Sequence, residues 1–123
     1  MNAPAAGRCV LIVEDEMSMV MLLEDILTDA GYHVLKAARL PAALVLAENE
    51  SIDAAILDIN LAGTHVFPVA DVLIRRNIPF IFASGYGDAG LPDGYRQQQM
   101  LQKPYGLEQL QHALATLVDG KPG

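Results

Sequence analysis

Short, almost wholly apolar runs separated by amphipathic stretches constrain the fold of this chain more than any other feature of its sequence. Four such runs occupy residues 9–13, 33–37, 54–57 and 80–83, and a weaker fifth occupies residues 99–102. The first, third and fourth contain hardly any polar residue, which is typical of strands that are covered on both faces in a parallel sheet. The second and fifth contain polar residues, so we expect them at the edges of the sheet.

The stretches between these runs have the periodicity of helices. Close to the C-terminus, apolar residues recur at intervals of three and four, namely at Leu107, Leu110, Leu114 and Leu117. This spacing places them on one face of a helix. An earlier helix is predicted from about Met17 to Ala30, because Gly31 is a common residue just beyond a helix end. Pro41 and Pro68 each indicate the start of a helix, since the fixed φ of proline suits the first turn.

Five strands that alternate with up to five helices predict an α/β fold of three layers. With right-handed crossovers, the strand order 2-1-3-4-5 fits this pattern, which is a flavodoxin-like, doubly wound, five-stranded parallel sheet. The fourth helix is predicted to be short or irregular, because residues 85–98 contain four glycines and Pro92. We expect one domain over residues 8–119, with flexible tails at residues 1–7 and 120–123.

Composition argues against several classes of function. The formal net charge of −7, from 8 Lys and Arg against 15 Asp and Glu, disfavours binding to nucleic acid, which needs clustered basic residues. Cys9 is the only cysteine, so we expect neither a disulfide within the chain nor a cysteine-based metal site. No apolar run is long enough to span a membrane and the first residues do not resemble a signal peptide, so we expect a cytoplasmic protein that does not bind membranes.

Polar side chains follow several of the predicted strands at the point where each strand ends. In strand order these residues are Glu14, Asp15, Asp58, Ser84 and Lys103. Each of them alone has an ordinary structural explanation, such as a helix cap, a turn or a solvated surface charge. Because ligands bind at the carboxyl ends of the strands in open parallel sheets, their convergence on one edge indicates a functional site.

The chemistry of these residues suits phosphoryl transfer to a carboxylate. Three carboxylates within a few ångströms would repel one another by roughly 4 kcal/mol per pair at an effective dielectric constant of about 20. A divalent cation such as Mg²⁺ or Mn²⁺ would remove that cost, and these ions prefer oxygen ligands. Asp58 can then act as the nucleophile of aspartyl-phosphate chemistry, while Lys103 and the Ser84 hydroxyl counter the charge on the phosphoryl oxygens. The residues therefore predict reversible phosphorylation of Asp58.

The same residues resemble the signature of the receiver domains of bacterial response regulators, which belong to two-component systems. Residues 11–16 (LIVEDE) are similar to the family's first strand and acidic pair, and residues 55–60 (AILDIN) to its phosphoacceptor strand. Residues 103–105 (KPY) are similar to its Lys-Pro-aromatic motif. The resemblance implies a phosphorylation switch that catalyses only its own phosphorylation and dephosphorylation, and so is not a turnover enzyme.

The resemblance also implies a metal site with a defined set of ligands. Asp58 would be the phosphoacceptor, and Mg²⁺ or Mn²⁺ would be bound directly by Asp15, by Asp58 and by the main-chain carbonyl of Asn60. Glu14 would act through a metal-bound water.

On the phosphoryl side, the resemblance makes Ser84 the switch residue and Lys103 the phosphoryl-binding lysine, with a cis bond before Pro104. The donor would be a sensor histidine kinase or a phosphotransfer protein. Residues 79–87 (PFIFASGYG) are further similar to the Phe-Ala-Thr-Gly-X-Gly motif of a receiver subgroup found mainly in alphaproteobacteria. That subgroup includes single-domain regulators and receivers that act in the general stress response, and Ser84 stands where it has Thr.

One departure from the family concerns how phosphorylation is read out. Receivers usually have an aromatic residue three positions before the lysine, which turns inward with the switch residue, whereas this chain has Met100. Tyr86 and Tyr105 are the candidates to replace it, and a purely structural role for each is the alternative. Only residues 119–123 follow the last predicted helix, so we expect a stand-alone receiver. It would be a monomer or weak dimer that acts on an unknown downstream protein or as a phosphate sink.

Three alternatives are open at this point. A degenerate receiver would bind partners without phosphorylation, although the acidic, Ser and Lys set is complete. A phosphohydrolase of the aspartyl-phosphate type would need a second carboxylate two residues after the nucleophile, where this chain has Asn60. A flavodoxin-like cofactor carrier is disfavoured, because the loop after the first strand is acidic where a phosphate-binding loop needs main-chain amides or hydroxyls.

Overall fold

Five parallel strands form a single sheet at the centre of the structure, which is a computed structural model that describes residues 7–84, 99–102 and 106–119. The strands are β1 (Cys9–Val13), β2 (His33–Ala37), β3 (Ala54–Asp58), β6 (Phe80–Ser84) and β7 (Gln99–Gln102). Their order across the sheet is β2-β1-β3-β6-β7, and each neighbouring pair is parallel. The predicted order 2-1-3-4-5 is therefore confirmed, as is the position of the two polar strands at the edges.

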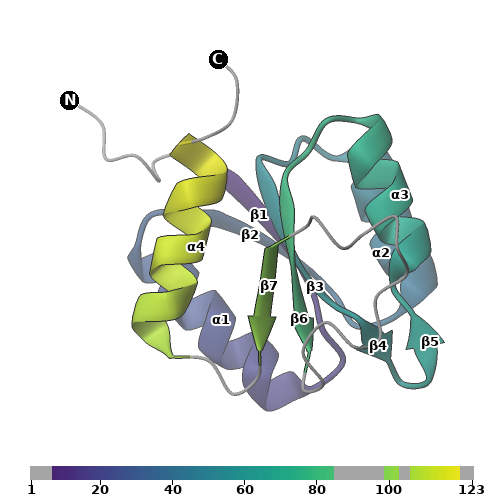
Figure 1. Ribbon diagram of the computed structural model, residues 1–123, viewed down its shortest axis with the longest axis horizontal. Helices are drawn as coiled ribbons and strands as arrows, with labels where there is room; N and C mark the ends of the chain where they lie inside the picture. Colours follow the sequence, from purple (N-terminus) through teal and green to yellow (C-terminus); the bar gives the residue numbers. More distant parts are fainter. Residues whose placement is uncertain (1–6, 85–98, 103–105, 120–123) are drawn as a thin grey trace.

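Two layers of helices cover the sheet. The helices are α1 (Met17–Asp29), α2 (Leu40–Asn49), α3 (Phe67–Arg75) and α4 (Leu107–Asp119). Figure 1 shows α1 and α4 on one face of the sheet and α2 and α3 on the other. None of these helices is both long enough and apolar enough to cross a membrane, within the part of the chain that the structure describes.

The core is split by the sheet into two apolar clusters. Alternate residues of a strand point to opposite faces, so Val10 and Ile12 of β1 pack with α1 and α4, whereas Leu11 and Val13 pack with α2 and α3. All five residues of β1, β3 and β6 are buried. This double coverage is the reason why these three strands are almost wholly apolar in sequence.

The helix boundaries follow the local signals. Pro41 and Pro68 each occupy the second position of a helix. Helix α1 ends at Asp29 with Ala30 as its cap, one residue before the predicted end, and Gly31 follows with a φ of 98°. The predicted irregular fourth helix, at residues 85–98, lies outside the described residues, as do almost all of the predicted tails, so these expectations stay predictions.

A two-stranded hairpin that the sequence analysis did not predict follows β3 directly. It consists of β4 (Asn60–Leu61) and β5 (Thr64–His65), which are antiparallel, with Ala62 and Gly63 as the turn. Ala62 has a φ of 51° and Gly63 a φ of 90°, the positive values that two-residue hairpin turns require. Strands of two residues are too short to show an alternating pattern in sequence, and Ala is not a typical residue for such a turn.

Cys9, the single cysteine, is buried at the start of β1. Burial raises the pKa of its thiol, and the nearby carboxylates of Asp53 and Glu50 raise it further. The Cys9 main-chain amide donates a 2.8 Å hydrogen bond to Asp53 Oδ2, which ties the start of β1 to the residue just before β3. A neutral thiol in this position packs as a small apolar side chain.

Arg76 joins the ends of α2 and α3 on one face of the sheet. Its guanidinium Nη1 donates hydrogen bonds to the main-chain carbonyls of Ala47 and Glu50, the latter at 3.0 Å. These carbonyls belong to the last turn of α2 and its cap, where helix carbonyls have no partner within the helix and the macrodipole is negative. Arg75, its neighbour, instead forms a 3.8 Å ion pair with Glu48 between two exposed side chains.

These two arginines give a matched test of the contact. We predict that Arg76→Ala lowers the free energy of unfolding by about 1–2 kcal/mol, because it leaves carbonyls at the end of α2 without their charged donor. Arg75→Ala should lower it by less than about 0.5 kcal/mol, since exposed ion pairs contribute little. Urea denaturation followed by circular dichroism measures both. Equal losses in the two variants would contradict this account of the contact.

Candidate functional site

Three strands bring polar side chains to the same edge of the sheet. Glu14 directly follows β1, Asp58 is the last residue of β3, and Ser84 is the last residue of β6. The register pairs Asp58 with Ala83, so Ser84 lies one position further along the neighbouring strand. Parallel strands end at a common edge, which explains why residues that are far apart in sequence gather here.

Glu14, Asp15 and Asp58 form a compact carboxylate cluster. One carboxylate oxygen from each lies within 4.8 Å of the others. Glu14 and Asp58 are only 2% and 8% exposed, whereas Asp15 is more open to solvent. At this separation each pair of charges repels by about 3–4 kcal/mol for an effective dielectric constant of about 20. The cluster therefore favours a bound cation, and its oxygen ligands suit Mg²⁺ or Mn²⁺.

The loop that presents these carboxylates is held by hydrogen bonds from two main-chain amides. The Glu14 amide donates to the carbonyl of Ala37 at the end of β2, at 3.1 Å. Glu14 Oε2 in turn accepts a 3.2 Å hydrogen bond from the amide of Glu16, the residue that precedes α1. The turn from β1 into α1 is thus fixed on both sides of Asp15.

The remaining predicted site residues divide into two groups. Asn60 lies at the start of β4, two residues beyond Asp58, and Ser84 is buried at 5% exposure. Lys103, Pro104, Tyr86 and Tyr105 lie outside the described residues, so the roles predicted for them stay predictions.

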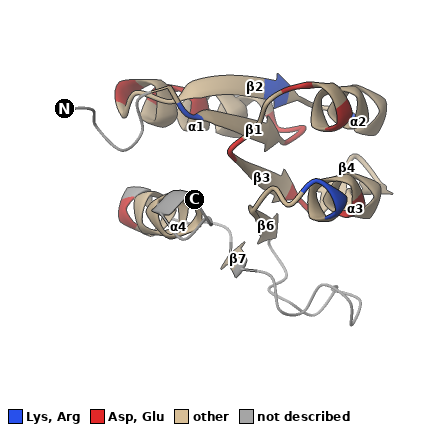
Figure 2. Cartoon of the chain, turned by 90° about the horizontal axis from the view of Figure 1, so that it is seen from above, with Lys and Arg blue, Asp and Glu red and all other residues tan. Residues whose placement is uncertain are grey.

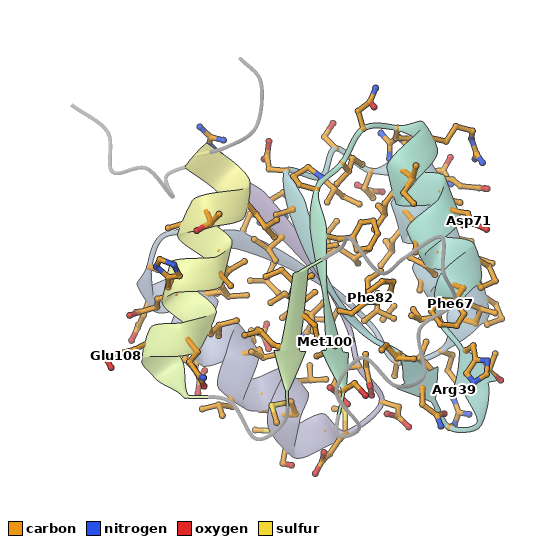
Figure 3. All side chains as sticks on the ribbon, viewed as in Figure 1. Arg39, Phe67, Asp71, Phe82, Met100 and Glu108 are labelled. Carbon is orange, nitrogen blue, oxygen red and sulfur yellow. The ribbon has the colours of Figure 1, made fainter. Side chains whose placement is uncertain are left out.

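Met100, at the position where the family usually has an aromatic residue, is partly buried on β7. It pairs in register with Phe82 of β6 and packs against the apolar cluster on the α2 and α3 face (Figure 3). Phe82 meets Phe67 of α3 edge to face, with ring centroids 5.9 Å apart. This contact could not be predicted from the sequence, because nothing in the local pattern pairs residues 67 and 82.

A parallel sheet of this order, with a carboxylate cluster at the carboxyl ends of its central strands, defines the fold and site of a receiver domain. Residues 10–115 match the family model described as the response regulator receiver domain. This chain therefore belongs to the receiver domain family of two-component response regulators.

Comparisons with individual proteins agree with this assignment. The solution structure of SdrG from Sphingomonas melonis is 35% identical, with a TM-score of 0.76, over 96% of this chain and 99% of that one. The receiver domain of the sensor histidine kinase PA1611 from Pseudomonas aeruginosa is 25% identical, with a TM-score of 0.75, over 93% and 99% of the two chains. That crystal structure has a magnesium ion coordinated in the active site cleft.

A longer relative is the transcriptional regulatory protein TcrA from Mycobacterium tuberculosis. It is 32% identical over 112 residues, which are 85% of this chain and 44% of that protein. The chain thus spans less than half the length of this curated relative.

The repulsion within the carboxylate cluster generates a prediction about divalent cations. Millimolar Mg²⁺ should raise the melting temperature of the wild-type protein, because a ligand that binds only the folded state stabilises it. Asp15→Asn should be more stable than wild type by about 1 kcal/mol without Mg²⁺, and should gain much less when Mg²⁺ is added. Differential scanning calorimetry measures both effects.

Asp29→Asn is the control, because Asp29 is an exposed residue at the far end of α1. It should respond to Mg²⁺ as the wild type does. A response of Asp15→Asn equal to that of the wild type would show that the cluster does not bind the cation.

Proposed function

We propose that this chain is a phosphorylation switch that accepts a phosphoryl group on Asp58 in a reaction that depends on Mg²⁺ or Mn²⁺. The observation that carries the proposal is the set of three carboxylate oxygens within 4.8 Å of one another at the sheet edge. Such a cluster is costly unless a cation offsets its charge, and a cation there is well placed to counter the charge of a phosphoryl group.

Each residue of the cluster has a proposed role toward the metal. Asp15 and Asp58 would bind it directly, together with the main-chain carbonyl of Asn60, and Glu14 would act through a metal-bound water. When bound, the metal offsets the negative charge on the phosphoryl oxygens. The magnesium ion in the active site cleft of the PA1611 receiver domain supports this assignment.

The proposed chemistry is transfer of a phosphoryl group from a phosphohistidine to a carboxylate. A carboxylate oxygen of Asp58 attacks phosphorus, the P–N bond to the donor imidazole breaks, and its electron pair stays on the imidazole nitrogen. The Ser84 hydroxyl donates a hydrogen bond to one phosphoryl oxygen, and the Lys103 ammonium pairs with another. The chain would thus catalyse its own phosphorylation and dephosphorylation only.

The output is proposed to be a change in protein–protein contacts. A phosphoryl group adds about −1.5 to −2 charge, by analogy with hydroxyl phosphates, and draws Ser84 at the end of β6 toward it. A coupling of about 1–3 kcal/mol is enough to change the affinity for a partner appreciably. We propose that the chain acts in the cytoplasm as a stand-alone receiver or a phosphate sink, in stress-response regulation. It would be a monomer or a weak dimer.

The exposed side of α1 is proposed to bind the protein that donates the phosphoryl group. Met17, Met21 and Leu22 are 64%, 61% and 52% exposed there. Met17 and Met21 line a pocket of about 240 Å³ together with Glu14 of the carboxylate cluster. Acidic residues lie on each of the helices α1 to α4 that the structure describes, as Figure 2 shows. We therefore expect a donor that presents an apolar helix face with a basic rim, and flexible methionines adapt readily to such a surface.

Phosphorylation itself is tested with a small phosphodonor. Wild-type protein incubated with acetyl phosphate and Mg²⁺ should gain the mass of one phosphoryl group, and Asp58→Asn should gain none, because its amide is not a nucleophile. Intact-protein mass spectrometry under mild conditions measures the difference. Asp25→Asn, on exposed α1, should label as the wild type does. Absence of the added mass on the wild type, or equal labelling of Asp58→Asn, would disprove the proposal.

The donor surface has a separate test that compares a protein donor with a small one. Met21→Glu should slow transfer from a phosphorylated histidine kinase or phosphotransfer protein by about 10-fold or more, because a charge replaces an apolar contact within an acidic surface. Labelling by acetyl phosphate should be unchanged. Val45→Glu on α2 is a matched control, since Val45 is 59% exposed on the opposite face. Equal transfer to Met21→Glu and Val45→Glu would rule out α1 as the donor surface.

A further inference from the structure

We propose that the β4–β5 hairpin directs the main-chain carbonyl of Asn60 toward the carboxylate cluster, and that the Asn60 side chain is the positioning residue that holds the hairpin in this state. The inference rests on the proposed metal site at Glu14, Asp15 and Asp58. It assigns to the hairpin a function that its sequence does not show, namely setting the direction of one oxygen ligand.

The alternation of main-chain groups along β3 gives the first argument. The amide of Ala55 donates to Pro79 O and the amide of Ile59 donates to Ala83 O, each at 3.1 Å, so these main-chain groups face β6. Successive residues of an extended strand direct their main-chain groups to opposite sides. Asn60, the next residue and itself in a strand, therefore directs its carbonyl away from β6. That is the side of β1, the strand that ends just before Glu14 and Asp15.

The pairing within the hairpin gives a second argument for the same direction. Antiparallel ladders alternate between pairs that exchange hydrogen bonds and pairs that do not. The Val66 amide donates to Ile59 O at 2.9 Å, which lies one step before the pair Asn60–His65. Asn60 and His65 are therefore a pair that does not exchange hydrogen bonds. The Asn60 carbonyl points outward from the hairpin, where it is available to a cation.

The Asn60 side chain closes the turn on which this pairing depends. Its Oδ1 accepts a 2.8 Å hydrogen bond from the amide of Gly63. Ala62, the other turn residue, has a positive φ of 51°, which is unfavourable for a residue with a Cβ atom. A hairpin with two pairs of residues has few main-chain hydrogen bonds of its own. The hydrogen bond from the Gly63 amide to the Asn60 side chain is therefore a substantial part of the stabilisation of the turn.

The hairpin contacts the apolar core through side chains on either side of its turn. Leu61 of β4 is buried at 3% exposure. The ring of His65 in β5 lies 5.5 Å from that of Phe67. Phe67 in turn meets Phe82 of β6, with ring centroids 5.9 Å apart (Figure 3). β4 is therefore anchored in the core through Leu61, whereas β5 is exposed and reaches the core only through the ring contact of His65. A change in the turn acts on the direction of the Asn60 carbonyl rather than on the fold.

Two variants disturb the turn and leave every proposed metal ligand in place. Asn60→Ala removes the side-chain acceptor but keeps the main-chain carbonyl. Gly63→Ala strains the backbone at a φ of +90°, and no atom lies within 4 Å of the added Cβ, so only the turn conformation is affected. We expect each to weaken Mg²⁺ binding by about 10-fold, the usual cost of losing a group that orients a ligand. Ala62→Asn is the control, because Asn suits this turn, and its affinity should stay within about two-fold of wild type.

Binding is measured by titrating Mg²⁺ and following amide chemical shifts by NMR, and unfolding free energies without Mg²⁺ are measured alongside. A second readout is the labelling of Asp58 by acetyl phosphate. The Mg²⁺ concentration for half-maximal labelling should rise by about the same factor. If the turn contributed only to stability, the two variants would have a lower free energy of unfolding than the wild type. The Mg²⁺ concentration for half-maximal labelling would then equal that of the wild type.

The outcomes separate this inference from the proposed function. Mg²⁺ affinities for Asn60→Ala and Gly63→Ala within about two-fold of wild type would overturn the role of the hairpin and leave the metal site standing. No Mg²⁺ binding by the wild type would instead overturn the proposed metal site. Should Asn60→Ala fail to fold, Gly63→Ala alone decides the question.

Discussion

Glu14, Asp15 and Asp58 hold carboxylate oxygens within 4.8 Å of one another, and like charges at that distance repel strongly even at a protein surface. Such a cluster persists only where the surrounding structure constrains it, and two of its members, Glu14 and Asp58, are buried while Asp15 is more open to solvent. Here the buried strands β1 and β3 supply that constraint, because they are neighbours in the sheet and both end at the cluster. The apolar burial of these strands thus keeps the site assembled, and a bound divalent cation would offset the repulsion that remains.

The same sheet separates the site from the contacts that stabilise the fold. Two apolar clusters, one on each face, hold the helices, and Arg76 joins the ends of α2 and α3 through main-chain carbonyls. These contacts involve none of the carboxylates. A receiver can therefore alter charge at the sheet edge without losing its core, which is what a reversible switch requires. The apolar surface on α1, between Met17 and Leu22, lies beside the site and is suited to a transient partner.

Much of this arrangement could be predicted from the order of residues along the chain. The strand order, the two edge strands and the proline-marked helix starts follow from apolar runs and local signals. The gathering of Glu14, Asp15 and Asp58 follows from the rule that parallel strands end at one edge. The site did not follow in full, because its distances depend on how the strands pack. The sequence shows that Met100 replaces the aromatic residue that receivers usually have three positions before the lysine. It does not show that Met100 packs against the apolar cluster that contains Phe82, because this contact depends on the pairing of β6 with β7.

The sequence by itself determined the class of fold and the edge at which the chemistry lies, because both depend on patterns that are local or that repeat with each strand. Only the tertiary structure decided how the edge is held. The turn at Ala62 and Gly63, with its bond to Asn60, forms against anchors in the core, and two strands of two residues carry no periodic signal. The contacts of Arg76 join residues 26 and 29 positions apart, and no local pattern specifies such partners. Interactions of this kind exist only after the chain has folded.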